Sequence, residues 1–338
     1  MMGGSLSLLK KSMAVFAAGA LAVLGLAACS DSTAQSTKKA SADRPAAQEQ
    51  TVNVGTLATE DFLPMWKAEK EKLFAKQGVK VKISVFSSAQ ELSAALAAKA
   101  IDGAMTDIPV AASLTKGGTP MTLSWVTLGQ TAKEGRFGIM VGPKSKVRDL
   151  KDLAGTPIGV GSGTMLEYVM DRLMLNAGVE KSQIMKEELK KLPVRFQLVM
   201  QGEAEAGVFP ASLLALGELQ GAKVIAEDTA GENLSQSVMA FRSDFVKDRA
   251  GQKAVKALRA AWDAAVKQIN ANPEMQRELM VANTKLADPL KATYPVPHYP
   301  AAARPQAESV KSVLEWMKEK GYADSLSYDP KSGALKKA

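Results

Sequence analysis

The sequence contains one cysteine and one histidine in 338 residues. A lone cysteine leaves no intrachain disulfide, and a single histidine cannot supply the several ligands of a transition-metal site. Cys29 precedes the folded body and His298 lies in a proline-rich tail, so neither can join a catalytic Ser-His-Asp or Cys-His arrangement. The sequence therefore predicts no metal site, no cofactor and no enzymatic activity.

Hydrophobic runs long enough to approach a membrane span are also missing after the first thirty residues. Lys10 and Lys11 precede an almost uncharged run at 13–28, which is short for a spanning helix and ends in small residues. These proportions predict a cleavable signal peptide at residues 1–28.

The end of this run, Leu26-Ala27-Ala28-Cys29, resembles the bacterial lipobox. The resemblance implies cleavage before Cys29 and acylation of its thiol, so that membrane lipid holds the protein through Cys29. The alternative is an ordinary signal peptide that happens to contain a cysteine. Residues 29–50 are mainly small and polar, which predicts a flexible tether.

Clustered positive charge is absent as well. Loss of the two signal-peptide lysines lowers the formal charge from +8 to +6, and the surplus is dispersed over predicted helix faces. Because no arginine-rich arm or alternation of basic and aromatic residues occurs, we expect no nucleic-acid partner.

What the chain does contain is an alternation of short β-like runs with helical ones. Expected strands are 52–57, 79–86, 104–106, 121–127, 158–161, 206–209 and 223–226; expected helices include 64–77, 89–100, 110–116, 165–176 and 194–201. Strands separated by helices of this length predict an α/β fold with mostly parallel sheets.

The pattern repeats after a shift of 103 positions, which places Phe209 over Thr106 and Pro210 over Asp107. The opening strands match at a slightly larger shift, with Val160 over Val54. Two further β-like segments, 137–141 and 236–242, bracket the second copy. We therefore predict two lobes joined by a two-crossing hinge. The alternative is that any two α/β units would show this pattern by chance.

These observations divide the chain into four predicted parts: signal peptide 1–28, tether 29–50, lobe I at 51–137 plus 241–338, and lobe II at 138–240.

Several motifs resemble the solute-binding proteins of nitrate, sulfonate, taurine and thiamine-precursor ABC importers. The most specific is Asp-Leu-Ala-Gly-Thr-Pro-Ile-Gly-Val at 152–160; others lie at 56–62, 100–107 and 202–210. The resemblance implies a type II periplasmic-binding-protein-like fold with two doubly wound α/β lobes. It also implies a monomeric extracytoplasmic receptor that passes a small polar, heterocyclic or sulfonate-like solute to an inner-membrane ABC permease. Two alternatives remain, namely an enzyme on the same scaffold and a partner-binding lipoprotein without a ligand site.

Ligands of open α/β sheets bind beyond the carboxyl ends of the strands. This rule, with Arg136 added as a possible counter-charge, selects the following candidate ligand-binding residues: Thr59, Glu60, Asp61, Phe62, Ser87, Ser88, Thr106, Asp107, Arg136, Ser162, Gly163, Thr164 and Phe209.

Each group of candidates has two interpretations. Residues 161–164 precede a helix and could bind an anion, or Ser162 or Thr164 could simply cap that helix. Glu60, Asp61 and Asp107 favour a ligand with a cationic or hydrogen-bond-donating nitrogen; the alternative is that such acids cap helices and face solvent. Phe62, Trp66 and Phe209 could wall the site or belong to the core.

Overall fold

The computed structural model describes residues 51–131, 134–230 and 233–337, all within one compact unit, Gln48–Ala338. The predicted signal peptide, Cys29 and the whole of the predicted tether lie outside the described residues. No helix in the described ranges is long and apolar enough to span a membrane.

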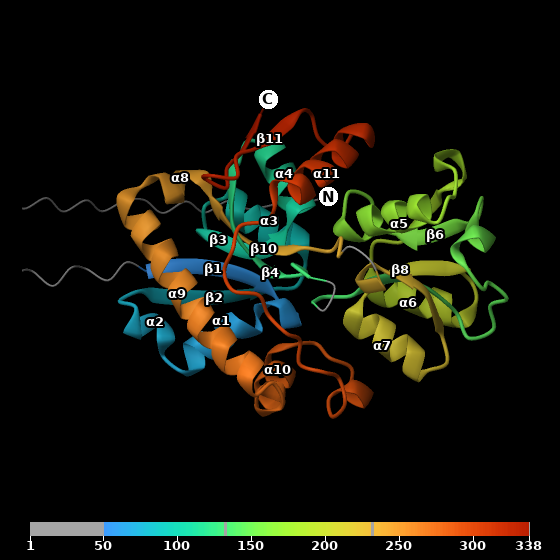
Figure 1. Cartoon of the computed structure of the whole chain (residues 1–338), viewed down its shortest axis with the longest axis horizontal. Coiled ribbons are helices and arrows are strands. Elements are labelled where there is room, and N and C mark those ends of the chain that lie inside the picture. Colours follow the sequence, from blue (N-terminus) through green and yellow to red (C-terminus); the bar gives the residue numbers. More distant parts are fainter. Residues whose placement is uncertain (1–50, 132–133, 231–232, 338) are drawn as a thin grey trace, which may run out of the picture. The chain divides into compact units, whose positions relative to one another are not determined.

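The first lobe is built on a five-stranded sheet in the order β2-β1-β3-β10-β4 (Figure 1). Its strands are β1 (Thr51–Leu57), β2 (Lys80–Phe86), β3 (Gly103–Asp107), β4 (Met121–Leu128) and β10 (Ser237–Arg242). β1 pairs in parallel with β2 and β3, whereas β10 runs antiparallel to both β3 and β4.

Helices and a small hairpin cover this sheet: α1 (Leu63–Lys70), α2 (Leu73–Lys76), α3 (Ala89–Ala97), α4 (Ile108–Lys116), α8 (Ser243–Lys247), α9 (Arg249–Ala271), α10 (Arg277–Asn283), α11 (Ala307–Glu319), β11 (Leu326–Tyr328) and β12 (Leu335–Lys337). The expected single helix at 64–77 is wrong. The chain breaks at Lys72, which adopts a left-handed conformation with φ of 55° and separates α1 from α2.

The second lobe has a sheet of the same design, in the order β7-β6-β8-β5-β9. Its elements are β5 (Phe137–Val141), β6 (Pro157–Val160), α5 (Met165–Asn176), β7 (Met185–Glu188), α6 (Leu192–Gln201), β8 (Ala206–Pro210), α7 (Ala211–Leu219) and β9 (Lys223–Glu227). The sequence did not predict β7, because this edge strand is exposed throughout and carries a charged sequence without apolar alternation.

The repeat is present at the level of structure. β3 and β8, and α4 and α7, begin 103 positions apart, as the sequence pattern predicted. The expected match of the opening strands is wrong, however. Val54 lies opposite Gly103 and Ile158 lies opposite Ala206, so Ile158, and not Val160, is the counterpart of Val54.

The chain crosses between the sheets twice, after β4 and before β10. Each crossing strand enters its sheet antiparallel to both neighbours, so each sheet has two parallel and two antiparallel pairings rather than a mostly parallel arrangement. The boundary expected at residue 240 falls inside β10, because all of β10 pairs within the first sheet.

The largest core lies between the first sheet and the long helix α9. Leu258, Ala261, Trp262, Ala265 and Ile269 recur at helical spacing on one face of α9 and are fully buried. The ring of Trp262 lies 6.0 Å from that of Trp125 in β4, which ties the helix to the sheet. This rigid layer supports the strand ends from which the site is built.

Candidate functional site

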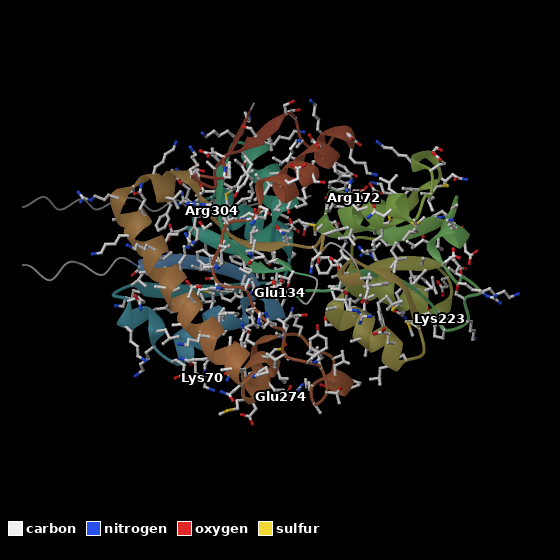
Figure 2. All side chains as sticks on the ribbon, in the orientation of Figure 1. Lys70, Glu134, Arg172, Lys223, Glu274 and Arg304 are labelled. Atoms are coloured by element: carbon white, nitrogen blue, oxygen red, sulfur yellow. The ribbon has the colours of Figure 1, made fainter. Side chains whose placement is uncertain are left out.

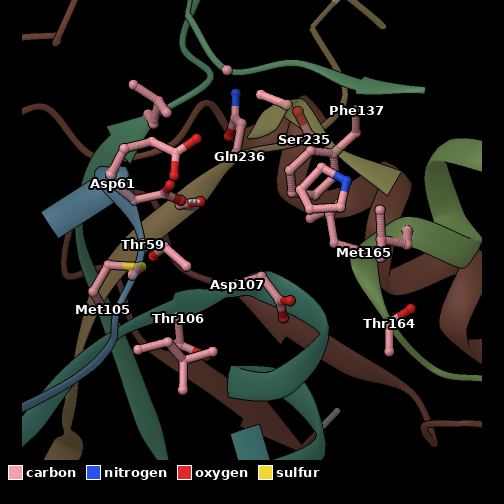
Figure 3. A pocket seen from close by; sticks show the side chains of 18 of the residues that line it. Thr59, Asp61, Met105, Thr106, Asp107, Phe137, Thr164, Met165, Ser235 and Gln236 are labelled. Carbon is pink, nitrogen blue, oxygen red and sulfur yellow. Dashed lines mark hydrogen bonds between the residues drawn. The ribbon is translucent and has the colours of Figure 1, made fainter. Parts of the chain in front are cut away.

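A cavity of about 270 Å³ lies where strand ends of both lobes meet the two crossing segments (Figure 3). Its walls come from the ends of β1, β3 and β4, the first turns of α3, α4, α5, α6 and α7, and residues of both crossings. This is the edge at which α/β sheets bind ligands, and small-molecule sites typically measure about 300–1,000 Å³. The cavity therefore suits a small solute.

Two acidic residues follow β1 and line one side of the cavity. Glu60 and Asp61 begin a short 3-10 turn, η1 (Glu60–Phe62), and both are half-buried. Burial raises the pKa of Glu60, and the neighbouring charge of Asp61 raises it further; burial also raises the pKa of Asp61. The expectation that these acids might only cap a helix and face solvent does not apply, since neither forms a cap bond and both face the cavity.

Protein donors hold these two carboxyl groups in place. The hydroxyl of Tyr294 donates to Glu60 Oε1 at 2.7 Å, and that of Tyr299 donates to the Glu60 carbonyl at 2.7 Å. Ser237, at the start of β10, donates to Asp61 Oδ2. We call residues 294–300 the proline-rich strap. Through Tyr294 and Tyr299, the strap fixes the position of Glu60.

Asp107 supplies a third carboxyl group from the end of β3. Its Oδ1 accepts a hydrogen bond from Val110 N at 2.7 Å, so it caps α4, and it also lines the cavity. Burial raises the pKa of Asp107 to about 6, with a further contribution from the charge on Asp61. Capping and facing a ligand site are therefore compatible in this residue.

Arg136 does not act as the expected counter-charge for these acids. Its side chain reaches the cavity wall, but its guanidinium pairs with Glu218 through two bonds of 2.9 Å and also donates to Glu227. These pairs raise the pKa of Arg136 above its already high value. Among the described residues, no Lys, Arg or His lies within ion-pair distance of Glu60, Asp61 or Asp107.

Two further polar groups on the cavity wall have an atom without a partner. Gln236 Oε1 and Thr59 Oγ1 are buried and make no hydrogen bond to any described residue. Gln236 as a whole is only 6% exposed. Buried polar atoms in native proteins are almost always paired, so an orphan in a cavity wall indicates a group that a ligand or water satisfies.

The rest of the wall is largely apolar and comes from both lobes. Leu57, Leu92, Met105, Val110 and Leu128 line it from lobe I, and Phe137, Met165, Leu166, Leu192 and Pro210 line it from lobe II. Figure 3 shows Asp61, Thr59 and Met105 on one side and Phe137 and Met165 on the other. A ligand in this cavity meets acidic and other polar groups on part of the wall and hydrocarbon on the rest.

The proposed anion cradle at 161–164 is filled by the protein's own carboxylates. Ser162 N donates to Glu188 Oε1 at 3.1 Å, and Gly163 N donates to Glu167 Oε2 at 2.7 Å. Thr164 caps α5 by accepting from Glu167 N, and it alone of the predicted residues 162–164 lines the cavity. The helix-capping interpretation is therefore the one that the structure favours.

Four other candidates lie outside the cavity wall. Ser88 caps α3, and Ser87 N donates to Glu91 Oε2, so both serve the start of that helix. Phe62 is fully buried and packs edge-on against Trp66 at 5.4 Å. Phe209 is fully buried against Phe196, because alternation along β8 turns it away from the cavity while Pro210 lines it.

Sequence reasoning missed the second crossing as part of the site. Ser235, Gln236 and Ser237 all line the cavity, yet the β-like run starting at 236 was interpreted only as a crossing. A hinge segment must pass the edge where the two sheets meet. On that ground, its polar residues could have been predicted to line the ligand site.

His298 lies on the strap as an exposed residue, and its Nδ1 is 3.5 Å from Oε1 of Glu134, which is labelled in Figure 2. No group of three or more potential metal ligands exists within the described ranges.

A second set of buried acids lies where α5 of lobe II meets the C-terminal segment of lobe I. Glu167 Oε1 is 2.7 Å from Lys186 Nζ and 3.3 Å from Lys320 Nζ, and it accepts from Tyr322 Oη at 3.0 Å. Asp171 Oδ2 is 2.8 Å from Lys320 Nζ. We call these five residues the α5–α11 cluster; it contributes nothing to the cavity wall.

The fold and sequence have recognisable relatives. The family described as NMT1/THI5 like matches residues 59–276, well over half of the chain. The aliphatic sulphonate binding protein SsuA of Escherichia coli is similar in structure, with a TM-score of 0.67, 18% identity, and coverage of 81% of this chain and 88% of that one. The alkanesulfonate-binding protein SsuA of Xanthomonas axonopodis pv. citri, bound to MOPS, gives 0.66 and 18%, covering 82% and 96%.

The periplasmic nitrate-binding protein NrtA of Synechocystis PCC 6803 gives a TM-score of 0.55 at 17% identity, with coverage of 70% of this chain and 65% of that chain. At this level of identity the likeness establishes the two-lobe periplasmic-binding-protein fold. The sequence has no significant match among curated proteins.

Proposed function

The chain belongs to the NMT1/THI5-like family, and from this premise we propose that it is the extracytoplasmic solute-binding component of an ABC importer. The observation that carries the proposal is the cavity at the strand ends, whose wall is shared between both lobes and both crossing segments. A solute bound there contacts both lobes at once. Binding is then coupled to the relative position of the lobes, which a permease can recognise.

The structural neighbours support this role, since their names describe periplasmic proteins that bind sulfonates or nitrate. By analogy, the protein works outside the cytoplasm as a monomer and delivers its solute to a permease of the inner membrane. Acylated Cys29 holds it at the membrane, and residues 29–50 give it the reach to meet its permease. Among the described residues, no cysteine or histidine lines the cavity, so the wall offers no Cys-His or Ser-His pair.

A thermal-shift screen tests the receptor role. The purified protein is heated with sulfonates, nitrate, pyrimidines, purines, amino acids, amines and aromatic acids, because a solute that binds only the folded state raises the melting temperature. Mass spectrometry then shows whether the bound compound is recovered intact, and titration gives the stoichiometry.

We expect one chemical class to raise the melting temperature, to bind one to one and to be recovered unchanged. Recovery of a transformed compound would favour the enzyme. Absence of any shift across all classes would contradict a receptor role.

A further inference from the structure

We propose that the solute is a small organic cation, a protonated amine or amidine whose nitrogen lies against Glu60, Asp61 and Asp107 while its apolar body fills the rest of the cavity. The inference rests on the proposed function and adds the chemical class of the solute. The structural neighbours named above bind anions according to their names, so this class would set the protein apart from them.

The charges around the cavity are unbalanced. Three carboxyl groups share one small cavity, yet no basic side chain in the described part of the chain pairs with any of them. Proteins pair buried carboxylates with cations or leave them protonated, because an isolated buried charge is costly. A cationic ligand supplies the missing counter-charge.

The cavity wall also contains uncharged oxygen atoms that lack hydrogen-bond partners among the described residues. Gln236 is more than nine-tenths buried, and its Oε1 lies in the cavity wall without a partner among the described residues. Thr59 Oγ1 has none either. An ammonium or amidinium group carries several N–H donors and no acceptor, so it matches a wall rich in unsatisfied oxygen atoms.

The residues that the sequence predicted to bind an anion are already paired with carboxylates of the protein. The amides of Ser162 and Gly163 donate to Glu188 and Glu167, and Arg136 is paired with Glu218 and Glu227. Two helix starts remain: α6 and α7 begin at the cavity wall, at Leu192 and beside Ser212, and neither has a side-chain cap. The positive ends of these helices give a sulfonate an alternative place to bind, so anions must be included in the test.

The test uses sets of compounds that share one ring and differ in charge. Benzylamine and benzamidine are compared with the neutral benzyl alcohol and the anionic benzenesulfonate, and the same comparison is made with cyclohexyl and phenethyl compounds. Each dissociation constant is measured by calorimetry on the purified protein at pH 7.5. We expect the cations to bind at least roughly ten-fold more tightly than their neutral counterparts, because charge-assisted hydrogen bonds exceed neutral ones by that much.

Two matched variants locate the effect. Asp107 and Asp248 both cap helices with their carboxylates, but only Asp107 lines the cavity. Asn caps a helix about as well as Asp, so both Asp→Asn variants are expected to fold. Asp107→Asn should weaken cation binding roughly ten-fold and leave binding of the neutral alcohol unchanged, whereas Asp248→Asn should change neither.

Three results would overturn the inference: equal binding of cations and neutral compounds, tighter binding of the sulfonates, or equal effects of the two variants. If anions or neutral compounds bind and cations do not, the receptor role stands and only the ligand class is wrong. If no compound in this series or in the broad screen binds, both proposals fall.

Discussion

Buried acids occur in two regions of this molecule that differ in the charges around them. In the α5–α11 cluster, the buried Glu167 has two lysines and a tyrosine within 3.3 Å, and Asp171 shares one of those lysines. In the cavity, Glu60, Asp61 and Asp107 have hydroxyl or amide donors but no cation within the described ranges.

The difference separates a structural use of buried charge from a functional one. Where α5 of lobe II meets the C-terminal segment of lobe I, the chain supplies both signs of charge, so each acid has a basic partner. Where a solute is to be received, the chain supplies one sign only and leaves the carboxyl groups at raised pKa values.

The largest effect is expected for Glu167→Ala. The substitution leaves Lys186 and Lys320 without their shared partner and removes the acceptor of Gly163 N. Removing one member of a buried ion pair costs about 3–5 kcal/mol, and the partly exposed lysines place this case near about 3 kcal/mol. Urea unfolding measures this loss in the free energy of unfolding.

Glu315→Ala is the control, because Glu315 is exposed and lies 3.9 Å from Lys311. A similar loss of stability in both variants would contradict a structural role for the buried Glu167.

Asp107→Asn should act in the opposite direction. Because its folded pKa of about 6 lies above the usual 3.8, Asp107 binds a proton in the folded state that the unfolded chain releases. Its contribution to stability is therefore fully present below about pH 4 and is lost as the pH rises through about 6. At pH 7.5 the ligand-free variant should be more stable than the wild type by about 1–2 kcal/mol.

The check is urea unfolding of the two proteins at pH 4.5 and 7.5. The advantage of Asp107→Asn should be much smaller at the lower pH. A variant that is less stable than the wild type at pH 7.5 would mean that Asp107 has a counter-charge after all.

Tyr294→Phe removes the hydroxyl that donates to Glu60 Oε1 at 2.7 Å. Glu60 has no cation to take over, so the free energy of unfolding should fall by about 1–1.5 kcal/mol, and the pKa of Glu60 should rise further. Unfolding at pH 7.5 measures the loss. A carbon-13 NMR titration of the carboxyl group reports the pKa, and an unchanged or lower value would argue against this role for Tyr294.

The smallest effect is expected for Tyr322→Phe, the matched change in the α5–α11 cluster. Its hydroxyl donates to Glu167 Oε1 at 3.0 Å and lies 2.6 Å from Lys186 Nζ. Both lysines remain beside Glu167, so the loss should be about 0.5 kcal/mol. A loss of stability larger than that of Tyr294→Phe in the same assay would mean that the hydroxyl matters more beside an acid that has cationic partners, contrary to this expectation.

Much of the fold could be predicted from the sequence because its signals are local. The helix at 165–176 was predicted at the bounds of α5, and the 103-residue shift placed β8 and α7 correctly. The break at Lys72 was not predictable from apolar periodicity, since a left-handed lysine carries no composition signal.

The site was predictable only in part because a residue's partners lie elsewhere in the chain. Thr59, Glu60 and Asp61 follow β1, Thr106 and Asp107 end β3, and all five line the cavity. Glu167, which accepts from the amide of residue 163, is only four residues along the chain, and Thr164-x-x-Glu167 is a capping pattern that could have indicated it. Glu188, which accepts from the amide of residue 162, lies on the unpredicted strand β7. Likewise, the strap tyrosines that hold Glu60 are separated from it by more than 230 residues.

The number of protons released when a cation binds tests most directly whether the cavity acids bind a positive charge. Calorimetry of benzylamine at pH 6, in two buffers with different ionisation enthalpies, gives the protons exchanged per ligand. At this pH Asp107 is partly protonated, so a bound cation should lower its pKa and release protons to the buffer. We expect net release of protons, which Asp107→Asn should diminish. Proton uptake, or binding without any exchange of protons, would contradict the claim that a cationic ligand pairs with the cavity acids.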